Sequence, residues 1–536
     1  MAELGLSERI HHFRQLQNQL RYRWPAINEP GEGDADILVI PSFSVDQQEL
    51  QKIDGFLHYE ERLLFALMRL RNPRTRLIYI TSQPLPPIVI DYYLQLLPGI
   101  PFSHARDRLM LLPIYDQSLK PLSQKILERP RLLQRIRHSL RPDCAYMVCF
   151  NSTDLERDLS VALNIPLLAA DPELLYWGTK SGSRQIFAEC GIPHPDGSPL
   201  VREVSGLVRE AAQLWQRQPS LQRMVVKLNE GFSGEGNALL SLRDAPLGSG
   251  ASLEERRAFV AQQLPNLKFE SATESWTHFS QRIPLLGVIV EAFIEGEGKQ
   301  SPSVQGRVNP TGEVEILSTH DQILGGPSGQ IYLGCRFPAH EDYRIQLQEL
   351  GLKIGENLAQ KGVLERFGVD FVIVPPPPGS SEPWQVNAIE INLRKGGTTH
   401  PFMTLKLLTN GVYDLSDGCF YSQQGLPKFY VASDNLQREH YQGLLPTDLM
   451  DIIAHHHLHF DTGSETGTVF HLMGCLSEFG KLGLTSIGNS PEQAEEIFAQ
   501  ARESLDTETQ STWQACSGQA QATQPISWDN VPIGFA

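Results

Sequence analysis

An apolar run that ends in a lysine and passes directly into a glycine-rich turn constrains the fold of this 536-residue chain most strongly. Residues 224–228 are typical of a buried strand and carry Lys227. The glycines that follow, Gly231, Gly234 and Gly236, allow backbone N–H groups to face an anion. In a P-loop or a protein kinase the glycines precede the lysine, so neither fold matches this order. The pattern predicts a phosphate site, with an ordinary strand and hairpin loop as the alternative.

The composition is that of a large globular protein, with 41% hydrophobic and 20% charged residues. Lys and Arg number 46 against 62 Asp and Glu, and the net charge of -16 argues against broad nucleic-acid or anionic-membrane binding. No apolar stretch reaches membrane-spanning length, and the seven cysteines lack metal-ligand spacing. We therefore expect a cytoplasmic protein in a reducing compartment, without zinc and without nucleic-acid or membrane partners.

The first part of the chain alternates short β-rich runs with helical patterns, which predicts a parallel α/β sheet. The runs cover residues 37–40, 77–81, 109–114, 145–150 and 166–170. A further helical pattern begins at Thr179 and ends at Gly191. It carries Lys180 near its start, where a helix N-terminus favours an anion. The alternative for Lys180 is an ordinary solvated lysine.

The second part of the chain shows strand patterns separated by turn signals, which predict an antiparallel region. These strands are expected at residues 288–293, 304–308, 314–318, 369–374 and 386–394. Pro375–Pro378 fit an exposed hairpin tip, because proline cannot donate to a strand ladder. From about Asn410 the composition changes, and a strand, a strand and a helix are predicted at residues 467–476, 480–487 and 490–501.

Polar side chains gather on two of the predicted antiparallel strands. Asp370 lies on one strand, and Glu390, Asn392 and Arg394 alternate along the next. Residues two apart share a face of a strand, so these three point together while Ile389, Ile391 and Leu393 are expected to point into a core. If the strands form a hairpin, Asp370 joins the polar face. Two carboxylates and an amide suit Mg2+ bridging nucleotide phosphates, and an exposed face of mixed charge is the alternative.

With these elements in order, residues 179–402 resemble the ATP-grasp superfamily of carboxylate–amine ligases. The resemblance implies that Lys180 and Lys227 contact ATP phosphates, and that a loop covers them, containing Gly231, Ser233, Gly234 and Gly236. The run Val290–Ile294 matches the family's hinge, which implies Glu291 and the Ile294 backbone near adenine and Glu297 near the ribose. Magnesium is implied at Asp370, Glu390 and Asn392.

A narrower resemblance points to peptide ligases of the pheganomycin type, in residues 301–305, 319–322 and 394–401, and in 466–474 for the terminal domain. One departure matters, because D-alanyl-D-alanine ligases carry an arginine two residues before the first metal carboxylate and Gly368 stands there instead. A D-alanine ligase is therefore doubtful. Oxyanion-stabilising charge is expected from Arg394, Arg307 or a lysine, and Gln322 and Lys395 are further candidates for the substrate side.

The resemblance implies an α/β ATP-grasp fold with the following division. Residues 1–175 form a Rossmann-like pre-ATP-grasp domain, 176–300 the first subdomain with a lid over 196–284, 301–409 the second subdomain with the magnesium site, 410–507 a C-terminal α+β domain, and 508–536 a mobile tail.

The implied activity is ATP-dependent formation of an amide through an acyl phosphate, with Arg394, Lys227 and Arg307 as catalytic residues. ATP and Mg2+ are the expected cofactors, a small-molecule or peptide carboxylate and an amine are the expected partners, and homo-oligomerisation is left open. Alternatives are a nucleotide-binding regulatory or scaffold protein without turnover, or an enzyme that forms a thioester or phosphorylates the acid.

A histidine-rich run, Ala454–His459, raises the question of a metal site. His455, His457 and His459 would share a face if the run were a strand. No carboxylate or cysteine lies at ligand spacing in the sequence, so a polar or structural stretch is the preferred interpretation. His471, in an apolar strand, is expected to be a core histidine.

Overall fold

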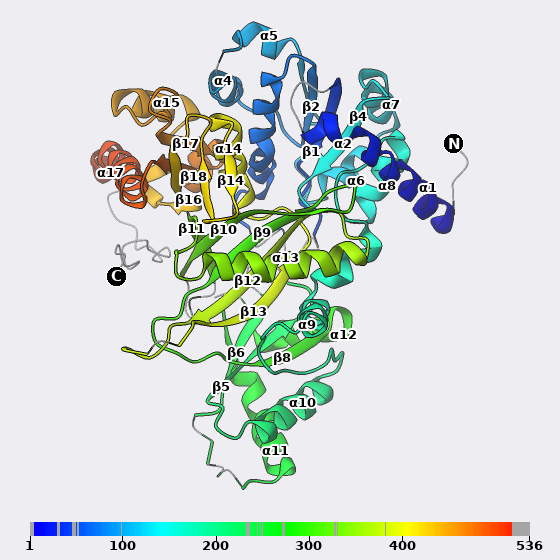
Figure 1. The fold of residues 1–536 in the computed structure, drawn as a ribbon, viewed down its shortest axis with the longest axis vertical. Coiled ribbons are helices and arrows are strands. Elements are labelled where there is room, and N and C mark those ends of the chain that lie inside the picture. Colours follow the sequence, from blue (N-terminus) through cyan, green and yellow to red (C-terminus); the bar gives the residue numbers. More distant parts are fainter. Residues whose placement is uncertain are drawn as a thin grey trace.

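The computed structural model describes residues 5–516 except 29–32, 46–49, 51–52, 98, 232–235, 244, 247, 249, 271–273, 326–328, 330 and 381, with side chains to residue 510. Within these residues the strands form three sheets, and the mixed α/β class expected from the sequence is confirmed. Figure 1 shows β5–β8 at one end of the long axis, β9–β13 in the middle, and the N-terminal and C-terminal elements at the other end. No helix of the described part is both long and apolar enough to cross a bilayer.

The N-terminal unit is a parallel sheet of order β3-β2-β1-β4. Its strands are β1 (Ala35–Ile40), β2 (Thr75–Thr81), β3 (Leu109–Pro113) and β4 (Ala145–Cys149). The fifth predicted strand, residues 166–170, is wrong, because that run adds only a single bridge from Leu167 to Met147. The helical segments are α1 (Leu6–Asn18), α2 (Leu20–Asn28), η1 (Phe56–Arg71), α4 (Pro87–Gln95), α5 (Phe102–Arg106), α6 (Leu122–Leu127), α7 (Pro130–Ser139) and α8 (Asp154–Leu163).

A small antiparallel sheet of order β7-β6-β5-β8 follows, and it carries the lysine strand. Apolar side chains on one face of it, such as Val226 and Val290, pack against helices, with Leu207 of α10 and Val260 of α11 fully buried. The elements are η2 (Pro172–Gly178), α9 (Lys180–Glu189), α10 (Val204–Arg217), β5 (Arg223–Leu228), β6 (Asn237–Ser241), α11 (Leu253–Gln263), η3 (Leu264–Asn266), β7 (Lys268–Phe269), α12 (Trp276–Leu286) and β8 (Val288–Ala292).

The large central sheet runs β13-β12-β9-β10-β11-β16-β15-β14, with β18 beside β16 and β17 beside β18. Its first part comprises β9 (Pro302–Val308), β10 (Val314–Gly325), β11 (Ile331–Phe337), α13 (Arg344–Gln360), β12 (Glu365–Val374), β13 (Gln385–Asn392) and α14 (Thr399–Thr409). The predicted hairpin of β12 and β13 is confirmed, and it pairs Asp370 directly with Glu390.

The C-terminal elements extend this sheet rather than building a separate one, because β16 pairs with β11. They are β14 (Val412–Asp414), β15 (Cys419–Tyr421), β16 (Pro427–Gln437), η4 (Glu439–Tyr441), α15 (Pro446–His455), β17 (Gly467–His471), η5 (Met473–Cys475), α16 (Leu476–Phe479), β18 (Lys481–Gly488) and α17 (Pro491–Cys516). The helix predicted at residues 490–501 continues to Cys516 as α17, into the first part of the predicted mobile tail, and residues 517–536 of that tail lie outside the described residues. The domain boundaries themselves stay predictions.

One hydrophobic core joins the N-terminal unit to the C-terminal strands. Leu64 of η1 and Tyr93 of α4 are fully buried in the same cluster as Phe470 of β17 and Leu484 of β18. Burial of this apolar area fixes two parts of the chain that lie about 400 residues apart in sequence. The consequence is that side chains of η1 and of β18 can face the same cavity.

Candidate functional site

A cavity of about 510 Å³ is lined by residues from all these units. We call one part the β8 end, lined by Val225, Lys227, Glu291, Ala292, Phe293 and Ile294. We call another part the β18 end, lined by Asp54, Tyr59, Arg62, Asp434 and Lys481. Asp370, Glu390, Asn392 and Arg394 line it as well. In Figure 1, β8 lies below and β18 above β9, β12 and β13 along the long axis.

Lys180 is held at the first position of α9 and reaches the hairpin strand. The Thr179 side chain caps this helix by accepting from the Gly182 N–H, and Gly191, with φ of 62°, follows its end. The Lys180 side chain is buried, and its Nζ lies 2.8 Å from Glu390 Oε1 and 3.5 Å from the Gly231 carbonyl oxygen. The structure therefore joins a predicted phosphate ligand to a predicted magnesium ligand in one ion pair.

Lys227 shares a buried carboxylate with an arginine that the sequence patterns did not single out. Glu291 is 2% exposed, and its two oxygens lie 2.5 Å from Lys227 Nζ and 2.8 Å from Arg184 Nη1. Burial alone would raise the pKa of Glu291, but the charges of Lys227 and Arg184 and their hydrogen bonds hold that pKa below its ordinary value. Glu291 therefore neutralises the buried Lys227 and the partly buried Arg184, and Arg184 was missed because its partner lies 107 residues away.

Asp370, an acid of the predicted magnesium set, has a raised pKa. Gln322 Nε2 donates to its Oδ1 at 2.6 Å, and Asn392 Nδ2 donates to its Oδ2 at 3.1 Å. Burial and, after it, the charge of the facing Glu390 raise the pKa of Asp370 to about 7. Two carboxylates and an amide that face one another in a cavity form a set of hard oxygen donors, which fits Mg2+. A divalent cation there would relieve the repulsion that raises this pKa.

A bulge changes which residues of β13 reach the cavity. The register shifts after the Asp370–Glu390 pair, and Phe371 then faces Ala388, so Ile389 is the extra residue. Ile389 lines the cavity beside Glu390, and the expectation that it points into the core is wrong. Ala388, Ile391 and Leu393 fill the core instead. Arg394 lines the cavity, where its Nη2 donates to Asn392 Oδ1 at 3.0 Å.

The structure describes only some residues of the predicted nucleotide loop and hinge. Gly231 and Gly236 face each other, and a Cβ at Gly231 would come to 3.5 Å from the Gly236 Cα. Ser233 and Gly234 lie outside the described residues. Ile294 lines the cavity and its carbonyl oxygen accepts from Lys299 Nζ at 3.4 Å. Glu297 is exposed and is not part of the described cavity lining.

Two substrate-side candidates lie elsewhere. Arg307 does not belong to the described lining of the cavity, because its Nη2 donates to Glu315 and to Asn28 and its guanidinium stacks on Trp24. Lys395 lines a separate small space with His400. The arginine was misplaced because charge and strand position alone do not say which face of β9 meets the N-terminal helices. The candidate Gln322, by contrast, lines the cavity.

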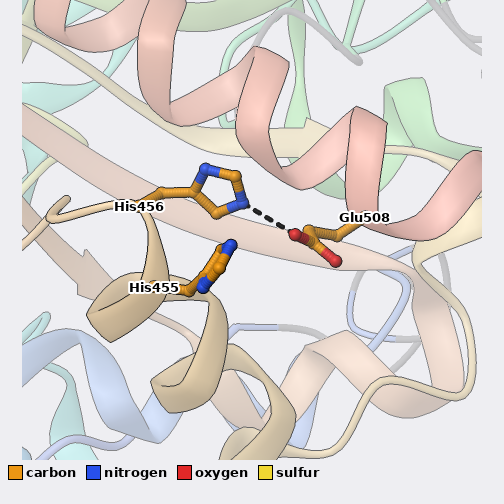
Figure 2. A group of neighbouring side chains, drawn as sticks. All are labelled: His455, His456 and Glu508. Atoms are coloured by element: carbon orange, nitrogen blue, oxygen red, sulfur yellow. Dashed lines mark hydrogen bonds and ion pairs between the residues drawn. The ribbon is translucent and has the colours of Figure 1, made fainter.

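The histidine run forms a different group from the one expected. Residues 446–455 are helical and His457 has a φ of 53°, so the strand alternation that would align the odd-numbered histidines is wrong. Figure 2 instead shows His455 and His456 beside Glu508 of α17, with His456 Nε2 at 2.8 Å from Glu508 Oε1. Possible ligand atoms of the three residues lie within 4.8 Å of one another. The carboxylate was missed because it lies 52 residues away. His471 is buried, as expected.

Two family descriptions match the chain. "IQCH-like, ATP-grasp" matches residues 172–268 and 252–416, and "PGM1 C-terminal domain" matches residues 448–500. The chain is 29% identical over 469 residues to L-propargylglycine–L-glutamate ligase of Streptantibioticus cattleyicolor, covering 85% of this chain and 91% of that protein. It is 25% identical over 459 residues to IQ motif-containing protein H of Danio rerio, covering 77% of this chain and 42% of that protein.

Solved structures share the fold at low identity. The biotin carboxylase domain of Hydrogenobacter thermophilus 2-oxoglutarate carboxylase, solved with MgADP, ADP and bicarbonate, matches with a TM-score of 0.51 at 11% identity over 88% of this chain and 90% of that chain. Biotin carboxylase of Campylobacter jejuni matches with a TM-score of 0.51 at 10% identity over 89% and 95% of the two chains. At such identities the match establishes the arrangement of the chain alone.

Proposed function

This chain belongs to the ATP-grasp superfamily, and on that basis we propose that it is an ATP-dependent carboxylate–amine ligase of the peptide-forming type, which works through an acyl phosphate. One observation carries the proposal. Lys180 pairs with Glu390, Glu390 faces Asp370, and both carboxylates line the same cavity as Lys227 and the Ile294 hinge. The groups that ATP and magnesium require are therefore gathered around one space.

The nucleotide is proposed to lie at the β8 end, with its base against the apolar side chains there and its phosphates toward Lys180 and Lys227. Asp370, Glu390 and Asn392 would hold Mg2+, which would draw charge from the transferring phosphoryl group. Because both lysines now pair with carboxylates, nucleotide binding would exchange these partners for phosphate oxygens. Buried cations attract phosphate more strongly than exposed ones do.

In the proposed reaction a substrate carboxylate oxygen attacks the γ-phosphorus and ADP leaves. An amine then attacks the acyl carbon, loses a proton and expels phosphate, which leaves an amide. Arg394 lines the cavity beside Asn392, where its planar guanidinium could orient the carboxylate and stabilise the oxyanion formed on amine attack. The β5–β8 sheet with α10–α12 is proposed to close over the nucleotide and exclude water.

The first test measures ADP release with a panel of carboxylates and amines, each alone and in pairs. We expect release to require both substrates, and 18O in the carboxylate to appear in the released phosphate. Glu390→Gln serves as the inactive control, and Lys353→Met, an exposed lysine of α13, as the matched neutral control. Release without any added acid, or no transfer of 18O, would reject the acyl phosphate.

The same assay separates the alternatives. Mass spectrometry of the product distinguishes an amide from a thioester or a stable acyl phosphate. A protein that only binds nucleotide would bind a non-hydrolysable ATP analogue but release no ADP with any substrate pair. The relative's printed name pairs two amino acids, so L-amino acids are the first compounds to test.

A further inference from the structure

Lys481 is a buried cation that lines the cavity without an anionic partner in the described part of the chain. It begins β18 opposite Gln437 of β16 and is 6% exposed. Its Nζ donates to the Tyr59 hydroxyl at 2.6 Å and lies 5.1 Å from the centre of that ring. No ion pair joins it to any described carboxylate. A buried charge with only a neutral partner is costly, so the site is prepared for an anion.

The neighbouring charges do not supply that anion. Asp434 is engaged by Arg62, which lies 3.9 Å above the Tyr59 ring. Asp54 also lines the cavity but is exposed to water. Arg62 in addition keeps a buried Nε–H that donates to no partner among the described residues. The β18 end therefore offers one uncompensated ammonium and one spare guanidinium donor.

We propose that Lys481, supported by Arg62 and Tyr59, binds a substrate carboxylate that takes no part in the reaction. The inference rests on the proposed ligase function, because the reacting carboxylate is expected near Arg394 and the phosphates near Lys180 and Lys227. The bound group is the free carboxylate of an amino-acid or peptide amine substrate, or a second carboxylate on the acid substrate. Both share the same chemistry, a planar anion at the β18 end.

This placement gives the C-terminal elements a role in selecting the substrate. Lys481 and Asp434 come from β18 and β16, whereas Tyr59 and Arg62 come from η1. The shared core of η1, β17 and β18 fixes these side chains relative to one another. A substrate without the extra carboxylate would leave the ammonium buried and unpaired, which is the stronger basis for discrimination.

The test compares acids with their amides in two arms. In the amine arm, each L-amino acid is compared with its α-amide, and in the acid arm L-glutamate is compared with L-glutamine and succinate with succinamate. We expect the wild-type enzyme to prefer the acid form by about tenfold or more in KM in one arm, which identifies the source of the carboxylate. Lys481→Met should lose that preference with the KM for ATP unchanged. Lys481→Arg should keep part of it, and Lys353→Met all of it.

A binding measurement keeps the inference independent of turnover. The melting temperature of the enzyme with a non-hydrolysable ATP analogue and Mg2+ should rise on addition of the preferred acid and not of its amide, and this rise should vanish in Lys481→Met. Normal ADP release without any acid-over-amide preference would overturn the Lys481 site and leave the ligase function standing. Acid-specific stabilisation without ADP release from any pair would reject the ligase function and support the site.

Discussion

The two ends of the cavity differ in the partners of their buried lysines. At the β8 end Lys227 and Arg184 share the buried carboxylate of Glu291, and nearby Lys180 pairs with Glu390. At the β18 end Lys481 is equally buried but has a hydroxyl as its partner. A ligand that brings both phosphates and a divalent cation suits the first arrangement, since it can satisfy lysines and carboxylates together. A simple anion suits the second.

The two ends also differ in how they affect the stability of the folded protein. Paired charges at the β8 end stabilise one another in the absence of ligand, so breaking a pair should be destabilising. The unpaired charge at the β18 end is a cost that only a ligand removes. Variants at the first end should therefore change stability and turnover together, and variants at the second should change substrate preference.

The largest effect is expected for Glu390→Gln, which removes one magnesium ligand and the partner of Lys180. Turnover should fall about a thousandfold or more, because charge on the transferring phosphoryl group is no longer offset. Initial rates of ADP release at saturating substrates measure this. The turnover of Lys227→Met should fall by about a hundredfold or more for the same reason. Turnover within a factor of two of wild type in both variants would reject the proposed roles of Glu390 and Lys227 in the reaction.

The second-largest effect is expected for Glu291→Gln, on the free energy of unfolding. The change leaves the buried Lys227 and the partly buried Arg184 without their shared anion, and the free energy of unfolding should drop by about 3 kcal/mol. Denaturant unfolding, with and without a non-hydrolysable ATP analogue and Mg2+, measures the drop and its partial recovery by phosphate. Glu295→Gln, which breaks an exposed pair with Arg223, is the control and should cost less than about 1 kcal/mol. Equal losses in the two variants would contradict the contrast between the ends.

The sequence predicted Lys227 of the β8 end, Lys180 and the β12–β13 hairpin well because the information for them is local. Lys227 with its strand, Lys180 with its helix start, and the hairpin of Asp370 and Glu390 each follow from patterns a few residues long. The β18 end has no such pattern. Tyr59, Asp434 and Lys481 meet because apolar burial joins η1 to β17 and β18, and nothing in the sequence around any one of them indicates a site.

Local patterns also failed where a small irregularity decides the geometry. Strict alternation along β13 placed Ile389 in the core, but one bulge turns it to the cavity. Arg307 sits on β9 among strands that do line the cavity, yet it packs against Trp24 of an N-terminal helix. Such outcomes depend on which faces of separate units meet, which periodicity within one strand does not encode.

A smaller effect, on the pH dependence of stability, is expected for Glu61→Gln, next in sequence to Arg62 of the β18 end. Burial raises the pKa of Glu61 to about 8 from an ordinary 4.5, opposed by hydrogen bonds from the Gly474 and Met473 N–H groups. The folded protein thus holds this proton more tightly than the unfolded chain does. This residue's contribution therefore lowers the free energy of unfolding as pH rises from about 4.5 to 8, with no further loss above.

Glutamine keeps the acceptor for Gly474 without a buried charge, so Glu61→Gln should be more stable than wild type at high pH by about 2 kcal/mol and close to it at pH 5. Denaturant unfolding at both pH values measures the difference. Glu478→Gln, on the neighbouring α16, is the matched control, since Glu478 is exposed. An advantage of the same size at both pH values would show that Glu61 is not the group that titrates.

The smallest effect is expected outside the described lining of the cavity, in His456→Ala. The pair of His456 with Glu508 joins side chains that are 26% and 41% exposed, so water and salt screen it. The free energy of unfolding should change by less than about 0.5 kcal/mol, and still less at high ionic strength. Unfolding curves of the chelator-treated protein, with and without added Zn2+, complete the test. If Zn2+ stabilises the wild type and not the variant, the three residues in Figure 2 hold a metal and the group is more than a surface ion pair.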